Sequence, residues 1–392
     1  MKKIYILMLA SLVIACNKGE GETVESAFID PTTLPQLFKY SFSRNGTSSV
    51  DVLECSLLEE PINALYTSYL KSASITNQVA YDLALSYYKN GLYHIKPEAE
   101  VARSPLHNGN REQILQDILQ IINTSAKIGG YGSSSGQNLR RREAAPGQTG
   151  YLGFSIGDPN RSFADEKGVV IAEVFDGMLK GAVYLDKILN YHLNEHLLDN
   201  ESLRTNHENV VLPLGHNYTE LEHHWDLAYG YYAFWKNLAR PEIPILKNSE
   251  RTIFNAFVQG RIELGRYRYD AMKQQIRIIR EELSKVAAAR AMNYLIGSNT
   301  IANLKEGNGS DAFVFISKGI GLVYALQFTR KPDGTHYMTY DECQNLLNQF
   351  QSGNGLWLQQ QLLADETTAG SLLNIAGAIG KAFGISINDL KR

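Results

Sequence analysis

Residues 250–301 read ERTIFNAFVQGRIELGRYRYDAMKQQIRIIREELSKVAAARAMNYLIGSNTI, and helix-forming side chains fill almost all of this stretch. We predict that it is helical throughout, with one break near Gly265, because glycine lowers the stability of a helix interior. Residues 266–290 are rich in basic side chains, with Glu281 and Glu282 among them, which is typical of a solvent-exposed helix face. The stretch by itself predicts a mainly α fold.

Helical spacing of apolar residues extends over most of the chain on both sides of this stretch. From Pro61 to about residue 90, and in later segments, apolar side chains recur every three or four residues. The later segments are 113–128, 165–198, 221–238 and 312–328, with shorter ones near the C-terminus. Short polar connections between amphipathic helices favour antiparallel packing, so we expect a helical bundle.

A single β-hairpin is expected near the N-terminus. Residues 38–42 alternate between apolar and polar side chains, and Asn45-Gly46 follows them before Val50. Alternation around an Asn-Gly pair is a strong hairpin signal. The glycine-rich stretch 129–161 is expected to be irregular, so this hairpin is expected to be the only strand pair.

The helices can be grouped into two lobes, at about 29–240 and 241–392. Residues 81–88 (YDLALSYY) resemble residues 225–232 (WDLAYGYY), with the same aromatic-Asp-Leu-Ala start and Tyr-Tyr end. A duplicated bundle explains this repeat, and so does coincidence between two tyrosine-rich helices. The predicted fold is therefore mainly α, a two-lobed helical bundle with a small N-terminal hairpin, and the duplication stays open.

The first 16 residues have the pattern of a bacterial lipoprotein signal. Lys2 and Lys3 precede an apolar run from Ile4 to Ala15, which is far shorter than the ~20 residues of a membrane-spanning helix. The run ends in Val-Ile-Ala-Cys, which resembles a lipobox, so Cys16 is expected to carry the lipid. The alternative is an ordinary cleaved signal peptide followed by a chance cysteine.

The expected layout is a signal peptide at 1–15, a lipidated flexible tether at 16–28 and a helical domain at 29–392. Such a protein is expected to be lipid-anchored to the outer membrane, facing the periplasm or the cell surface. No later segment is expected to be long and apolar enough to cross a membrane, so the lipid would be the anchor. Outer-membrane uptake components are the expected protein partners.

Composition excludes some classes of function. The formal net charge is −3, and this mildly acidic balance does not suit nucleic-acid binding. The sequence contains no P-loop and no dinucleotide fingerprint, and no nucleotide is expected as a partner outside the cytoplasm. Cys55 and Cys343 could form a disulfide in that compartment, and their state is left open.

The densest polar cluster in the sequence begins at His216 and ends at Asp226. Thr219 followed three residues later by Glu222 is a capping box, so a helix is expected to begin near Glu220. Helical geometry then predicts a buried face made of apolar and aromatic side chains. These are Leu221, Trp225, Ala228, Tyr232 and Trp235.

A metal site is one interpretation of this cluster. His216, Glu220 and His224 are predicted to converge at the helix N-terminus, with Asp226 and His223 as secondary ligands. Imidazole together with carboxylate suits a divalent transition metal, so iron or zinc is the expected cofactor. The other interpretation is a capped helix whose histidines hydrogen-bond to their neighbours.

A second cluster, His192-Leu193-Asn194-Glu195-His196, has the H-x-x-E-H pattern of the inverted zinc proteases. Two histidines four residues apart on a helix can hold zinc while the glutamate acts as a base. The cluster lies at the end of a predicted helix, and no third ligand stands out. A structural role for His192 and His196 on an amphipathic face is therefore the favoured interpretation.

Parts of the chain resemble two known families. Residues 222–231 (EHHWDLAYGY) resemble the signature of a domain family of unknown function found in bacterial lipoproteins. The hairpin around Asn45-Gly46, Lys167-Gly168 and residues 177–182 (GMLKGA) also fit that family, which implies no established activity. More distantly, the helical layout is similar to the imelysin-like proteins, whose duplicated bundles are linked to bacterial iron acquisition.

The imelysin-like motif, Gly-x-His-x-x-Glu, is present only with departures. Gly215-His216 leads to Glu220 with the spacing shifted, and His192-x-x-Glu195 has Asn190 in place of the glycine. The resemblance implies a non-enzymatic binding lipoprotein associated with iron or metal acquisition. The alternatives are a zinc metalloprotease and an accessory interaction lipoprotein with no ligand site.

Overall fold

The fold is mainly α-helical, as predicted. A computed structural model describes residues 39–132, 139–153, 161–307 and 309–391, so Cys16, the signal and the tether lie outside the described residues. The N-terminal part contains α1 (Leu53–Leu65), α2 (Gln78–Lys89), α3 (Pro97–Glu100), α4 (Arg111–Gly129), α5 (Ile171–Leu179), α6 (Glu195–Asp199), α7 (Glu201–Glu208) and α8 (Glu220–Tyr232). The C-terminal part contains α9 (Ser249–Leu264), α10 (Tyr269–Ile296), α11 (Ser298–Lys305), α12 (Gly309–Ala325), α13 (Tyr340–Phe350), α14 (Gln359–Leu362) and α15 (Leu372–Phe383).

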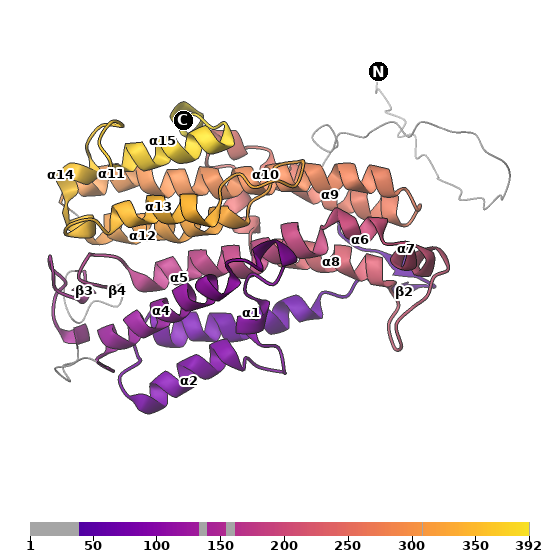
Figure 1. The fold of residues 1–392 in the computed structure, drawn as a ribbon, viewed down its shortest axis with the longest axis horizontal. Coiled ribbons are helices and arrows are strands. Elements are labelled where there is room, and N and C mark those ends of the chain that lie inside the picture. Colours follow the sequence, from indigo (N-terminus) through magenta and orange to yellow (C-terminus); the bar gives the residue numbers. More distant parts are fainter. Residues whose placement is uncertain (1–38, 133–138, 154–160, 308, 392) are drawn as a thin grey trace, which may run out of the picture.

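The helices form two layers (Figure 1). Helices α9 to α15 lie in one layer, drawn in orange and yellow, and α1 to α8 form the other. The most extensive contact between the layers is made by α5 and α12. Buried residues of both layers belong to one continuous apolar core.

The N-terminal hairpin is present where it was predicted. Strands β1 (Ser43–Arg44) and β2 (Thr47–Ser48) pair antiparallel, with Arg44 opposite Thr47. Asn45 and Gly46 have φ values of 51° and 79°, the left-handed conformation that a two-residue hairpin turn requires.

The prediction of a single strand pair is wrong. Strands β3 (Gly150–Leu152) and β4 (Ser162–Ala164) form a second antiparallel pair, with Tyr151 opposite Phe163. Part of this pair lies within the stretch predicted to be irregular. Each strand has three residues, which is too short for alternation to be visible in the sequence.

The exposed basic face predicted for residues 266–290 covers only one side of this segment, where Arg266, Arg268, Arg277 and Glu281 are exposed, whereas Arg280 is buried. From Tyr269 onward the segment belongs to α10, which packs against α9, α12 and α15 and is a central helix of its layer. Ile276, Ile279, Leu283 and the run Ala287–Ala289 are buried. The break near Gly265 is confirmed, because α9 ends at Leu264 and α10 begins at Tyr269.

The segment predicted as one long or bent helix at 165–198 contains two stretches of π-helix. After α5 the chain continues as η4 (Lys180–Leu185) and η5 (Lys187–His192). Single π-turns inside helices are frequent at functional sites. Here the widened turns bury Asp186, Lys187 and Asn190, each at most 1 % exposed, inside the protein.

One described helix is long and apolar enough to cross a membrane. It spans Ser310–Phe328, so the expectation that no later segment meets this test is wrong. However, 78 % of its apolar window is buried inside the protein, where it forms most of α12 in the core. Cys55 and Cys343 are both buried and free of any disulfide.

Helices α5 and α12 cross at two glycines. A Cβ atom on Gly177 would lie 2.5 Å from the carbonyl carbon of Gly321, so the two backbones touch directly. We expect Gly177→Ala to lower the free energy of unfolding by about 1–3 kcal/mol, because the added methyl group forces the helices apart. Gly377→Ala is the matched control, since Gly377 of α15 has open space around it.

Urea unfolding monitored by circular dichroism measures both changes. The control is expected to raise the free energy of unfolding by about 0.5–1 kcal/mol, because alanine is the better helix former. Equal effects of the two substitutions would contradict the close crossing.

Candidate functional site

Helix α8 begins as predicted. Thr219 and Glu222 form the expected capping box, and the predicted core face of this helix is buried. Glu222 and Asp226 are held by Arg261 of α9, at 2.9 Å and 3.0 Å. These two carboxylates therefore serve an internal ion-pair network that joins α8 to α9.

The structure does not bring His216, Glu220 and His224 together. His216 lies in the turn before α8 with its Nδ1 atom 3.8 Å from Asp51, and Glu220 is exposed. His224 faces His192 of η5, with 3.0 Å between their Nδ1 atoms. Within the described ranges there is no group of three or more His, Cys, Asp or Glu side chains that could hold a metal ion. The convergence predicted for the N-terminus of α8, with Asp226 and His223 as further ligands, is therefore not found.

The H-x-x-E-H residues do not share one helix. His192 ends η5, and Asn194 then caps the separate helix α6, in which His196 is exposed. Glu195 is paired with Arg280 at 2.7 Å. The expectation that the two histidines lie four residues apart on a single helix is wrong, because the chain turns between them.

His192 is buried and His224 is partly buried, and both imidazoles are neutral. Burial lowers the pKa of His192 well below its usual value, and the pKa of His224 is lowered to about 4, mainly by burial and then by His223. Lys187 lies close by, 5.0 Å from the ring centre of Tyr231. Its charge further disfavours protonation of both imidazoles.

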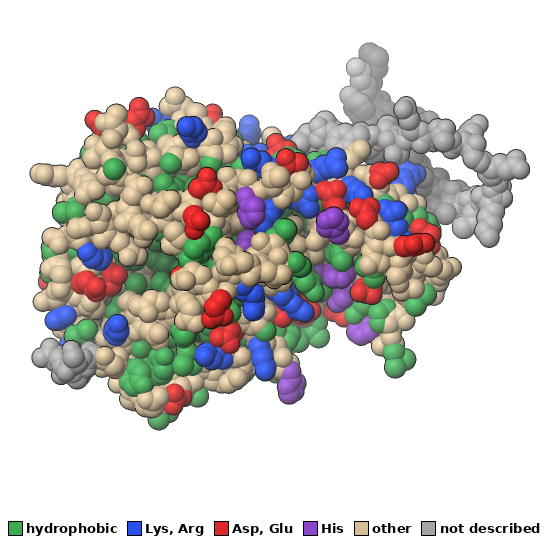
Figure 2. Space-filling view, viewed as in Figure 1, with side chains coloured by type: hydrophobic (Ala, Val, Ile, Leu, Met, Phe, Trp, Pro, Cys, Tyr) green, Lys and Arg blue, Asp and Glu red, His purple; other side chains and the backbone are tan. Residues whose placement is uncertain are grey.

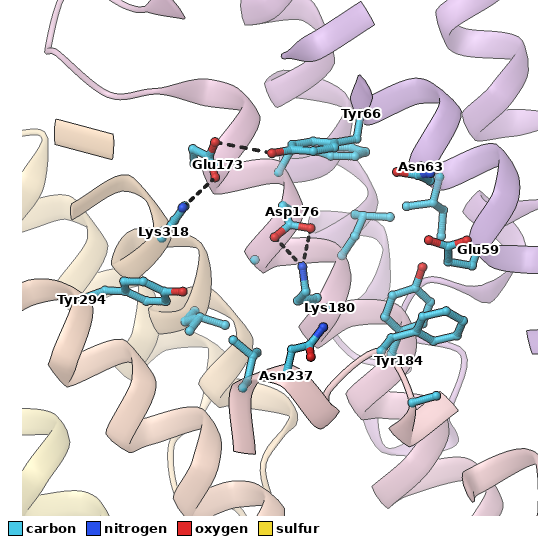
Figure 3. Close-up of a pocket in the computed structure, with 18 residues that line it drawn as sticks. Glu59, Asn63, Tyr66, Glu173, Asp176, Lys180, Tyr184, Asn237, Tyr294 and Lys318 are labelled. Atoms are coloured by element: carbon cyan, nitrogen blue, oxygen red, sulfur yellow. Dashed lines mark hydrogen bonds and ion pairs between the residues drawn. The ribbon is translucent and has the colours of Figure 1, made fainter. Parts of the chain in front are cut away.

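A cavity of about 440 Å³ lies beside the α5–α12 crossing, within the size range of small-molecule sites. It is enclosed by α1, η1 (Tyr66–Leu70), α5, η4, η6 (Lys236–Ala239), α10 and α12. Figure 3 shows ten polar or aromatic side chains around it. These are Glu59, Asn63, Tyr66, Glu173, Asp176, Lys180, Tyr184, Asn237, Tyr294 and Lys318.

Three carboxylates and two ammonium groups line the cavity. Glu173 accepts a hydrogen bond from the Tyr66 hydroxyl at 3.4 Å, and Lys318 lies 3.9 Å from its other oxygen (Figure 3). Asp176 pairs with Lys180 one helical turn away. Acidic groups therefore outnumber basic ones by one, counting Glu59 on α1.

Burial raises the pKa of two of these carboxyl groups. The pKa of Glu173 is raised, chiefly by burial and then by Asp176, although Lys318 opposes the change. The pKa of Glu59 is raised by burial and by Glu60, although Lys180 opposes the change. A cation placed in the cavity would stabilise both ionised carboxylates.

Aromatic rings form the apolar wall of the cavity. Tyr184 stacks on Phe234 with 4.6 Å between the ring centres. The ammonium group of Lys318 lies 6.0 Å from the ring centre of Tyr294, which is a cation–π distance. Carboxylates combined with aromatic faces are the usual recognition elements for an ammonium group.

The sequence patterns did not point to this site. A signal was present, since Glu173, Asp176 and Lys180 interrupt an otherwise apolar helix at spacings of three and four residues. Such a polar stripe indicates that one face of an otherwise buried helix is in contact with water. Glu59, Tyr66 and Lys318 come from distant segments, and no local pattern connects them.

Comparison with known proteins shows which family the chain belongs to. No curated protein and no solved structure matches it. The resemblance to a domain family of unknown function is confirmed at the level of the family. The chain belongs to the family described as a domain of unknown function (DUF4856), which it matches over residues 38–386.

Proposed function

We propose that the protein is a non-enzymatic, extracytoplasmic binding protein that captures a small cation in the cavity beside α5 and α12. The observation that carries the proposal is the excess of acidic groups at Glu59, Glu173 and Asp176, next to aromatic rings. An organic ammonium group suits this lining best. It can pair with the carboxylates and lie against the ring faces at the same time.

The location of the protein is part of the proposal. The lipobox-like sequence before Cys16 supports a lipid anchor at the outer membrane. The imelysin-like layout supports a role in uptake, which includes the capture of iron or another metal. The cavity lining is rich in oxygen atoms, but no described cluster could hold a bare metal ion. A metal would therefore have to arrive as a complex that brings its own ligands.

Isothermal titration calorimetry tests the proposal with putrescine, a small diamine, and with butanediol, its neutral analogue. We expect saturable binding of putrescine and none of butanediol, because only the diamine carries the charge that the carboxylates lack. Glu173→Gln is expected to weaken putrescine binding by about tenfold, which corresponds to about 1.4 kcal/mol.

Glu366→Gln is the matched control, since Glu366 is exposed and does not line the cavity. It is expected to bind putrescine as the unmodified protein does. Zinc chloride, titrated in parallel, separates the capture of a metal ion from the capture of an amine. Absence of binding in every titration would contradict the proposal and favour an accessory interaction lipoprotein.

A further inference from the structure

A second hollow lies on the other face of the α5–α12 crossing. Its volume is about 410 Å³, and residues of α4, α5, α12 and α13 line it together with the loop before α5. Figure 2 shows hydrophobic side chains at the bottom of a hollow between α13 and α5. Gly177 of α5 lines the cavity described above, whereas Val174 and Met178 of the same helix line this hollow.

The floor of this hollow is apolar. Helix α5 contributes Val174 and Met178, α12 contributes Ile320, and α13 contributes Leu347 and Phe350. Each of these five side chains is no more than 8 % exposed. An apolar chain or ring lying on this floor would be shielded from water, which stabilises it by about 25 cal/mol for each Å² buried.

The carboxylate nearest the floor is already satisfied. Asp117 accepts hydrogen bonds from the hydroxyl groups of Tyr324 and Tyr340, both at 2.9 Å, and from Gln344 at 3.3 Å. Asp165, in the loop before α5, accepts the backbone N–H groups of Lys167 and Val169. Both carboxylates are therefore hydrogen-bonded within the protein, although burial raises the pKa of Asp165 to about 6.

One ammonium group at the rim has no partner. Lys127 lies in the last turn of α4 and is exposed, and its side chain makes no hydrogen bond or ion pair with any described residue. The other rim lysine, Lys167, donates to the backbone carbonyl of Gly353. Glu166 is exposed and lies 3.4 Å from the Thr149 hydroxyl. Lys127 is therefore the group at the rim that can accept an anionic head group.

We propose that this hollow binds an amphipathic carboxylate, such as a medium-length fatty acid. Its acyl chain lies on the floor formed by α5, α12 and α13, and its carboxylate pairs with Lys127. The two cavities then take ligands of opposite character on the two faces of one helix crossing. The fatty-acid site is independent of the cation site and does not rely on it.

Titration of the full-length protein with decanoate and with decanol, both below the concentrations at which they aggregate, tests the proposal. We expect one molecule of decanoate to bind saturably and decanol to bind more weakly, because the alcohol lacks the charge that Lys127 recognises. Ile121 is partly exposed on α4, and Ile121→Trp places a larger side chain in the hollow. This change is expected to weaken the binding of both ligands by at least about tenfold. Thr124→Trp, also on α4, blocks the same space if the first variant does not fold.

Lys127→Gln tests the contribution of the Lys127 charge to binding separately from the contribution of the apolar floor. It is expected to weaken the binding of decanoate about threefold and to leave the binding of decanol unchanged, since an exposed ion pair contributes less than about 1 kcal/mol. Lys89→Gln is the matched control, because Lys89 is also exposed in the last turn of a helix but does not line the hollow. Absence of saturable decanoate binding, or equal binding to the folded tryptophan variants, would overturn the site. An unchanged preference for decanoate in Lys127→Gln would overturn the role of Lys127.

Discussion

Replacement of Arg261 by methionine is expected to lower the free energy of unfolding by about 3–5 kcal/mol, because it leaves the buried Asp226 without its cation and leaves Glu222 with Arg44 alone. Arg261 is 3 % exposed and binds Glu222 at 2.9 Å and Asp226 at 3.0 Å. Asp226 is fully buried, and its pKa is raised to about 6, chiefly by burial, even with Arg261 present. Methionine matches the apolar length of arginine and supplies no charge.

The same guanidinium also ties the N-terminal segment to the bundle. It donates to the Ser49 hydroxyl at 3.3 Å, and it lies 5.1 Å from the ring centre of Phe42. The loss of Arg261 should therefore loosen the hairpin as well as the α8–α9 contact. Urea unfolding monitored by circular dichroism and by tryptophan fluorescence measures the change, since Trp225 lies on α8.

Arg268→Met is the matched control. Arg268 is 48 % exposed and pairs with Glu263 at 3.4 Å, so its loss is expected to cost less than about 1 kcal/mol. A loss at Arg261 as small as the loss at Arg268 would show that Glu222 and Asp226 are stabilised by other partners.

A second large effect is expected in acid. The His192–His224 pair should contribute a fall of a few kcal/mol in the free energy of unfolding as the pH is lowered from about 6.5 to about 4. In the unfolded chain both imidazoles take up protons near pH 6.5. In the folded protein burial keeps them neutral, and the pKa of His224 is lowered to about 4. The unfolded state therefore binds more protons over this range, and acid favours it.

The charged groups around the pair also influence the pKa values of the two imidazoles. Lys187, His223 and Arg103 lower the pKa of His192, and Glu54 acts in the opposite direction on His224. Four of the described carboxyl groups have raised pKa values and oppose the effect on the whole protein, namely Glu59, Asp165, Glu173 and Asp226. The pKa values of Asp165 and Asp226 are each raised to about 6, so their protonation favours the folded state between about pH 4 and 6.

A comparison of variants isolates the histidine contribution. His224→Gln removes one titrating group and keeps a polar partner for His192, so its free energy of unfolding should depend less on pH between 6.5 and 4. Tyr191→Phe, which leaves both imidazoles in place beside the altered ring, should keep the dependence of the unmodified protein. Parallel pH profiles for His224→Gln and the unmodified protein would show that the pair is not held neutral.

Sequence patterns determined the helical fold and its local signals. The helical stretch at 250–301 with its break near Gly265, the Asn45-Gly46 turn and the Thr219–Glu222 capping box were all predicted correctly. Each depends on interactions within a few residues of the chain, namely helix propensity, turn conformation and side-chain capping. Such signals are present in the sequence before any distant contact forms.

Tertiary structure alone decided which polar groups share a site. His224 is close to Glu220 along the chain, but it pairs with His192 across the bundle. Glu59, Glu173 and Lys318 line one cavity because α1, α5 and α12 meet there, which depends on the Gly177–Gly321 contact between two backbones. Residues far apart in sequence become neighbours only through packing, and one chain without its fold carries no record of those distances.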